Sequence, residues 1–149
     1  MGALPFHLPI FLLTLLFTLS ACDGSAPAGD PLADILEIGD RFFATRIHDI
    51  LFDPNRYVGR AIQYEGIFWR FPLPEGNLDM VFRLLSSCCT SMEVGFEVYL
   101  NEVARVPNDT WVEVLGILEP FDYQGQTFFR LQVISMEERP ERGVDFVFN

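Results

Sequence analysis

Cysteine and histidine side chains are the groups in this 149-residue chain best suited to bind metal ions or attack a substrate. Cys88 and Cys89 are adjacent, and His48 and Glu93 are the nearest candidates for further ligands. Structural zinc sites have four ligands and catalytic ones three, and the strong sequence signature is a spaced cysteine pair. Zinc is therefore the one cofactor that the sequence suggests, and an adjacent cysteine pair is a weak signature for it.

Two other interpretations of Cys88 and Cys89 stay open. Both side chains are small enough to pack in a crowded bend without a chemical role. An oxidising compartment would also permit a disulfide between them or exchange with a partner thiol, although adjacent Cα atoms about 3.8 Å apart strain that ring. A cysteine nucleophile paired with His48 has no identifiable third group to orient it. The sequence therefore favours a non-catalytic protein.

Three aromatic residues, Phe68, Trp69 and Phe71, lie close together in a segment rich in β-forming residues. Such a group can form a platform on a barrel face that stacks nucleic-acid bases. It can equally well pack in a core or contact a protein. With 10 basic against 21 acidic residues, the net charge is −11. Phosphate backbones repel so acidic a chain, so nucleic acid is not an expected partner.

The third cysteine, Cys22, lies at the end of an apolar N-terminal segment. Residues 1–21 contain no Asp, Glu, Lys or Arg, and the apolar run at 11–19 suits a signal peptide but is too short to span a bilayer. Leu19-Ser-Ala-Cys22 resembles the bacterial lipobox, in which the cysteine becomes acylated, typically with palmitate. The alternatives are an ordinary secretory signal and an uncleaved anchor, since the usual N-terminal positive charge is missing.

We therefore expect a lipoprotein signal peptide at 1–21, with acylated Cys22 and a flexible tether at 22–34. Two or three acyl chains would anchor the protein stably on the extracytoplasmic side of the cell membrane. The folded domain is expected at 35–149. Half of all residues are hydrophobic and 15 are Phe, which excludes intrinsic disorder. Three cysteines are too few for a disulfide scaffold.

Alternating and β-branched residues predict five strands in the folded domain. Gly66 and Gly116 fall inside two of them and are typical of bulges or barrel bends. Segments 72–77 and 121–126 carry turn residues and are expected to connect strands. Five strands with such glycines favour a mainly β fold, a small five-stranded OB-like barrel. The predicted strands cover residues 61–71, 80–85, 94–100, 110–119 and 127–136.

The segment before the first predicted strand admits two structures. It is either a short helix or an edge strand followed by a turn. Asp53-Pro54 is typical of the start of a helical turn, with Asp53 as N-cap and Pro54 in the first position. The residues that would share one helix face are Phe42, Phe43, Ile47, Ile50 and Leu51.

Four segments in a fixed order carry a resemblance to a known family. They are Tyr57-Val-Gly-Arg-Ala-Ile-Gln-Tyr-Glu-Gly66, the pair Cys88-Cys89, Thr110-Trp-Val-Glu-Val-Leu-Gly116 and Arg142-Gly-Val-Asp-Phe-Val147. From Ile38 to Phe148 the chain resembles the uncharacterised C-terminal domain of bacterial permease-associated subunits (YcgQ-like proteins), here without their membrane spans.

The resemblance implies a role beside an integral-membrane permease, with zinc homeostasis as the suspected context. Longer members have small and acidic residues after the cysteine pair, whereas Thr90-Ser-Met-Glu93 follows it here. We therefore expect a membrane-anchored accessory or binding module for a permease or a zinc homeostasis system. The alternative is a thiol-dependent redox or metal-handling protein that uses Cys88 and Cys89.

Overall fold

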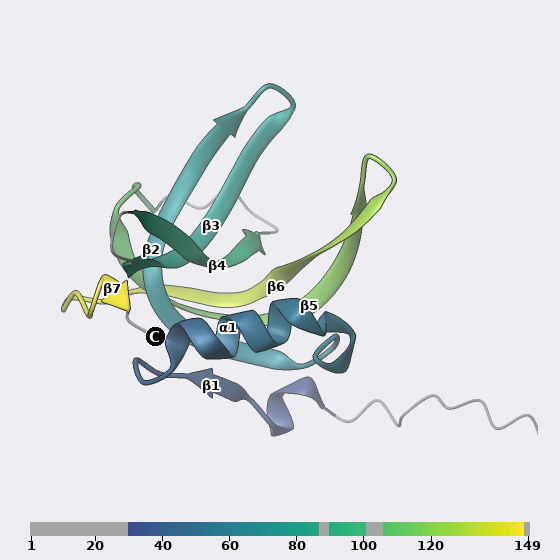
Figure 1. The fold of residues 1–149 in the computed structure, drawn as a ribbon, viewed down its shortest axis with the longest axis horizontal. Coiled ribbons are helices and arrows are strands. Elements are labelled where there is room, and N and C mark those ends of the chain that lie inside the picture. The colour runs from purple at the N-terminus through teal and green to yellow at the C-terminus, as the bar shows by residue number, and fades with distance from the viewer. Residues whose placement is uncertain (1–29, 87–89, 101–105, 148–149) are drawn as a thin grey trace, which may run out of the picture.

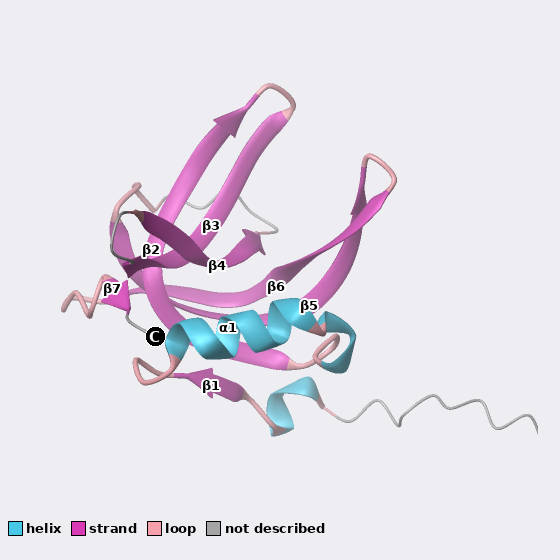
Figure 2. Cartoon of the chain, viewed as in Figure 1, coloured by secondary structure: helices cyan, strands magenta, loops and turns pink. Residues whose placement is uncertain are grey.

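A computed structural model of the chain describes residues 30–86, 90–100 and 106–147. Figure 1 shows their arrangement, and Figure 2 distinguishes helices, strands and loops. In chain order the elements are η1 (Pro31–Ala33), β1 (Leu36–Ile38), α1 (Phe43–Phe52), η2 (Pro54–Arg56), β2 (Ala61–Leu73), β3 (Gly76–Ser86), β4 (Ser91–Tyr99), β5 (Thr110–Tyr123), β6 (Gln126–Glu138) and β7 (Phe146–Val147), where η1 and η2 are single 3-10 turns.

Five of these strands close into a barrel. Antiparallel pairing joins β2 to β3, β3 to β4, β5 to β6 and β2 to β5, and β4 pairs with β6 in parallel. The short strands β1 and β7 add parallel edges to β2 and β3. The predicted mainly β fold, a five-stranded OB-like barrel, is confirmed.

The barrel interior is filled by side chains that alternate along the strands. Tyr64, Phe68, Val81, Phe96 and Leu118 are all buried there. The Tyr64 hydroxyl donates to the Val81 carbonyl at 2.7 Å and accepts from the Phe96 amide at 3.2 Å. Burial raises the pKa of Tyr64, so this hydroxyl keeps its proton and holds three strands together.

Both structures considered for the N-terminal segment are present. β1 is the edge strand, and α1 lies against one end of the barrel, where Phe43, Ile47 and Ile50 are buried. Two residues expected on the same helix face are exposed instead. Phe42 precedes α1 in a left-handed conformation (φ 63°) and is 61% exposed, and Leu51 lies at the flank of the helix and is 46% exposed.

The strands extend further than predicted, and the turns between them are shorter. Pro72 and Asn77, expected in a turn, are register partners within the β2–β3 ladder. Phe121 pairs with Phe128 in the β5–β6 ladder in the same way. Gly116 lies at a bulge of β5, as expected, and a Cβ there would come within 2.9 Å of the Gln132 carbonyl oxygen.

The helical turn at η2 begins at Pro54 as predicted. Asp53 takes the N-cap position, but its side chain makes no capping hydrogen bond. In the part of the chain that the structure describes, no helix has the length and apolar character needed to cross a membrane.

Candidate functional site

Two long hairpins project from one side of the barrel. β2 and β3 remain paired out to Leu73 and Gly76, and β5 and β6 out to Tyr123 and Gln126. The second hairpin closes in a two-residue turn whose residues, Gln124 and Gly125, both have positive φ (50° and 78°). Such turns match the twist of the flanking strands. The hairpin tips are therefore held by ladder hydrogen bonds beyond the core.

A groove of about 430 Å³ lies between the two hairpins. Its apolar surface comes from both hairpin arms, and its floor includes Glu97 of β4. Leu73, Tyr123 and Phe128 are 49%, 46% and 42% exposed, so large apolar side chains meet solvent here. The apolar lining residues are Leu73, Leu78, Phe121, Tyr123 and Phe128.

Aromatic contacts fix the β5–β6 wall of the groove. The Phe128 ring lies 5.9 Å from that of Phe121 and 6.3 Å from that of Tyr123, both within the range of favourable ring pairs. The Arg130 guanidinium stacks 4.7 Å above Phe121 and is bound by Glu119 at 2.9 Å. These contacts hold the aromatic rings in place before any ligand arrives.

The charged groups that line the groove are carboxylates. The Tyr123 hydroxyl donates to Glu75 at 3.5 Å across the gap between the hairpin tips. Partial burial raises the pKa of Glu97, and the positive charge of Arg130 opposes this shift. An apolar groove with acidic groups at its tip and floor favours a ligand that carries both apolar surface and positive charge.

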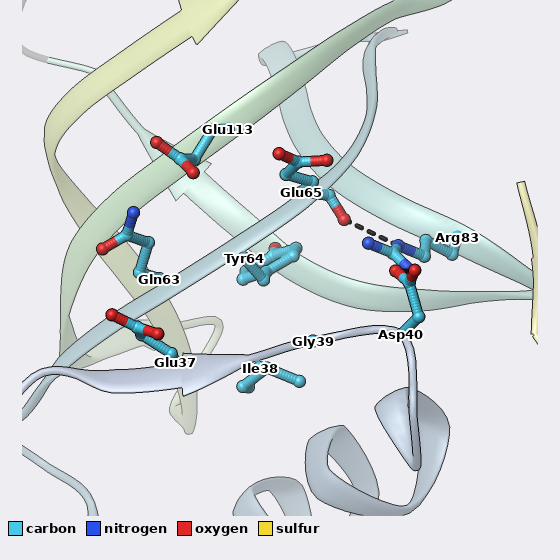
Figure 3. Close-up of a pocket in the computed structure, with 9 residues that line it drawn as sticks. All are labelled: Glu37, Ile38, Gly39, Asp40, Gln63, Tyr64, Glu65, Arg83 and Glu113. Carbon is cyan, nitrogen blue, oxygen red and sulfur yellow. Dashed lines mark hydrogen bonds and ion pairs between the residues drawn. The ribbon is translucent and has the colours of Figure 1, made fainter. Parts of the chain in front are cut away.

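A second pocket, of about 310 Å³, lies where β1, β2 and β5 meet (Figure 3). The guanidinium of Arg83, which is 1% exposed, borders it. Arg83 Nε donates to the Glu65 carbonyl at 2.7 Å, and Nη1 pairs with Asp40 at 2.6 Å. Its guanidinium also stacks on Phe43 at 4.5 Å and on Trp111 at 5.1 Å. Arg83 therefore joins the α1 end of the barrel to the sheet.

Two of the carboxylates that line this pocket, those of Glu65 and Glu113, also have partners. Trp111 Nε1 donates to Glu65 at 3.0 Å, and Arg139 pairs with Glu113 at 2.6 Å. Figure 3 shows Glu113 and Glu37 beside Gln63, away from Arg83. These pairings stabilise the fold, so the groove between the hairpins is the stronger candidate for ligand binding.

Comparison with protein families places most of the chain in a family. Residues 29–149 match the model of the DUF1980 C-terminal domain, which is most of the chain. The chain belongs to the DUF1980 C-terminal domain family. No curated protein and no solved structure matches it.

The aromatic residues proposed as one face of this DUF1980 domain lie on two sides of β2. Phe68 is fully buried in the barrel core, whereas Trp69 and Phe71 are half-buried on the opposite side of the strand. Their alternation follows from strand geometry. The Trp69 and Phe71 rings lie 6.3 Å apart, and Phe71 is the register partner of Leu78 in the groove. Phe68 is thus corrected to a core residue, and Phe71 is paired with a residue that lines the groove without lining it itself.

The predicted metal or redox residues are only partly within the described structure. Cys22, Cys88 and Cys89 lie outside the described residues. His48 is exposed on α1 and Glu93 is exposed on β4. Within residues 30–86, 90–100 and 106–147, no three His, Cys, Asp or Glu side chains form a group that could hold a metal ion.

Sequence reasoning missed the groove residues of the β5–β6 hairpin. Phe121 and Tyr123 fell in a segment interpreted as a loop, and Phe128 was assigned only to a strand. The available signal was Gly125 between alternating aromatic residues, since Gly at the second position of a two-residue turn is typical of a β-hairpin.

Proposed function

We propose that this chain is a non-catalytic binding module whose binding surface is the groove between the β2–β3 and β5–β6 hairpins. One observation carries the proposal. The groove exposes Leu73, Tyr123 and Phe128 beside the turns that follow the first and fourth barrel strands. Barrels of the OB type bind oligonucleotides and oligosaccharides at the equivalent loops, so this part of the barrel is a recurrent ligand-binding site.

The chemistry of the groove supports a polypeptide segment with both apolar and basic side chains as the ligand. Apolar side chains of the segment would cover the exposed rings, and a Lys or Arg would approach Glu97 and the aromatic faces. The net charge of −11 would draw such a segment toward the protein and repel nucleic acid.

We further propose that the module is held at the extracytoplasmic side of the cell membrane by lipid on Cys22. Its partner would be an extracytoplasmic segment of a permease or of a protein assembled with one. The lipobox-like sequence supports the anchor. The resemblance to the C-terminal domain of permease-associated subunits supports the partner and the context of zinc homeostasis.

A pair of blocked peptides tests the ligand chemistry. One contains two Phe and two Lys residues, and its counterpart has Glu in place of Lys. Fluorescence anisotropy would measure their Kd values for the full chain in lipid nanodiscs. We expect the Lys peptide to bind at least tenfold more tightly than the Glu peptide.

Matched variants test the place of binding. Phe128→Ala removes a ring from the groove and should raise the Kd of the Lys peptide about tenfold, or about 1.4 kcal/mol. Ile134→Ala removes an apolar side chain of β6 that is 46% exposed and is not part of the groove lining, so it should leave the Kd unchanged. Equal effects of the two variants, or equal binding of both peptides, would contradict the proposal.

A further inference from the structure

A second exposed apolar surface lies at the α1 end of the barrel. Phe52, the last residue of α1, is 92% exposed, and its neighbour Leu51 is 46% exposed. Val58 is 40% exposed, and its amide bonds the Pro54 carbonyl at 3.1 Å, beside the end of α1. We call Leu51, Phe52 and Val58 the α1 patch. Nearly full exposure of a phenylalanine points to a surface that another body covers.

The chain around the α1 patch is basic, in contrast to the protein as a whole. Residues 41–60 contain four Arg and two Asp, a net charge of +2, whereas the whole chain carries −11. Arg56 follows the patch residues Leu51 and Phe52 closely, and its side chain is 73% exposed, with its Nε 3.9 Å from the half-exposed carboxylate of Asp53. Apolar side chains flanked by basic ones bind the headgroup region of an anionic bilayer.

The expected tether reaches the barrel beside this patch. Asp30 lies eight positions after Cys22, and an extended chain of eight steps spans at most about 29 Å. The ion pair of Asp34 with Arg60 at 2.8 Å fixes the first described residues beside the segment that follows η2. A lipid on Cys22 would therefore keep the α1 patch within reach of the bilayer surface.

We propose that the α1 patch rests on the anionic surface of the membrane to which Cys22 is anchored. Leu51, Phe52 and Val58 enter the headgroup region, and the exposed Arg56 contacts lipid phosphates. The inference rests on the proposed anchor. Figure 1 shows α1 and the two hairpins on opposite sides of the barrel, so the groove opens away from the bilayer. The partner must then present its segment at a distance from the membrane.

Photocrosslinking in cells tests this orientation on the full chain. The photoreactive residue p-benzoylphenylalanine replaces Phe52 at the patch or, as a control, Tyr123 at the hairpin tip, where the side chain is also exposed. Intact-mass measurement after irradiation detects phospholipid adducts. We expect at least tenfold more adduct from position 52 than from position 123. Arg56→Glu should lower the yield at position 52 at least twofold, because it reverses a charge that attracts phosphate.

The same mass spectrum separates this inference from the proposed anchor. Acylated protein without a lipid adduct at position 52, or with equal yields at positions 52 and 123, overturns the orientation and leaves the anchor intact. Protein without acyl chains overturns the anchor. An adduct confined to position 52 in that protein would still support the α1 patch as a membrane contact.

Discussion

Two phenylalanines at opposite ends of the barrel, Phe43 and Phe128, are packed in opposite ways. At the α1 end, Phe43 is 1% exposed and packs against Tyr64 at 5.7 Å and beneath the Arg83 guanidinium. At the hairpin end, Phe128 is 42% exposed and contacts other rings that are themselves partly in solvent. The first arrangement contributes to folding stability, whereas the second leaves apolar surface available for a ligand.

This difference locates function where packing is incomplete. A hairpin that extends beyond the core loses little stability when its outer side chains are polar, so stability alone does not require rings at Phe121, Tyr123 and Phe128. Binding of a ligand that covers these rings would explain their presence, whereas folding stability does not.

Replacing a phenylalanine by alanine at the two ends of the barrel should give the largest difference in the free energy of unfolding. Phe43→Ala removes a fully packed ring and is expected to cost about 3–5 kcal/mol of unfolding free energy. Phe128→Ala removes two exposed ring contacts and should cost only about 1 kcal/mol. Urea denaturation of both variants measures the two values. Similar losses would mean that the hairpins belong to the folding core.

Loss of either partner of the Arg83–Asp40 ion pair should lower the free energy of unfolding, but by unequal amounts. Asp40→Ala leaves the buried Arg83 guanidinium without its carboxylate, and we expect a loss of about 3 kcal/mol. Arg83→Met keeps most of the buried volume and returns Asp40, whose side chain is 68% exposed, to water. Its loss should be smaller, at about 1–2 kcal/mol. Thermal unfolding checks the order, and a greater loss for Arg83→Met would contradict this account.

Glu97 should make the groove end sensitive to pH. Burial raises its pKa in the folded state, so the stabilisation by the protonated form is complete below the unfolded pKa and is lost as pH rises through the folded pKa. Glu97→Gln should therefore raise the free energy of unfolding at pH 7, measured by urea denaturation, by less than about 1 kcal/mol because water screens the half-exposed group. The gain should shrink as pH falls to 4. A constant difference across this range would exclude Glu97 as its source.

Replacing the cysteine pair should have the smallest effect on peptide binding in the groove. In this account Cys88→Ser with Cys89→Ser changes the Kd of the Lys peptide by less than twofold. Native mass spectrometry of the same double variant, with and without Zn²⁺, tests the zinc prediction separately. Stoichiometric zinc that the parent binds and the variant does not would establish a metal site apart from the groove.

The fold could be predicted largely from the sequence because its signals are local. Alternating and β-branched residues marked the five barrel strands, and the mid-strand glycine Gly116 marked the bulge. Hairpin length could not be predicted, since Pro72 and Phe121 read as loop residues until their register partners are known. The groove depends on two hairpins far apart in the chain, so its walls emerge only from the closed barrel. Phe68 was misplaced because three neighbouring aromatic residues were assigned to one face, although adjacent residues of a strand face opposite sides.

The most direct test is a nuclear magnetic resonance titration of the isotope-labelled full chain in nanodiscs with the Lys peptide. Amide shifts would compare the two ends of the barrel in one experiment. We predict saturable shifts at Leu73–Leu78, Glu97 and Phe121–Phe128, with none at Phe43–Ile50. Shifts concentrated at the α1 end, or no saturable shift in either region, would contradict the claim that the groove is the binding surface.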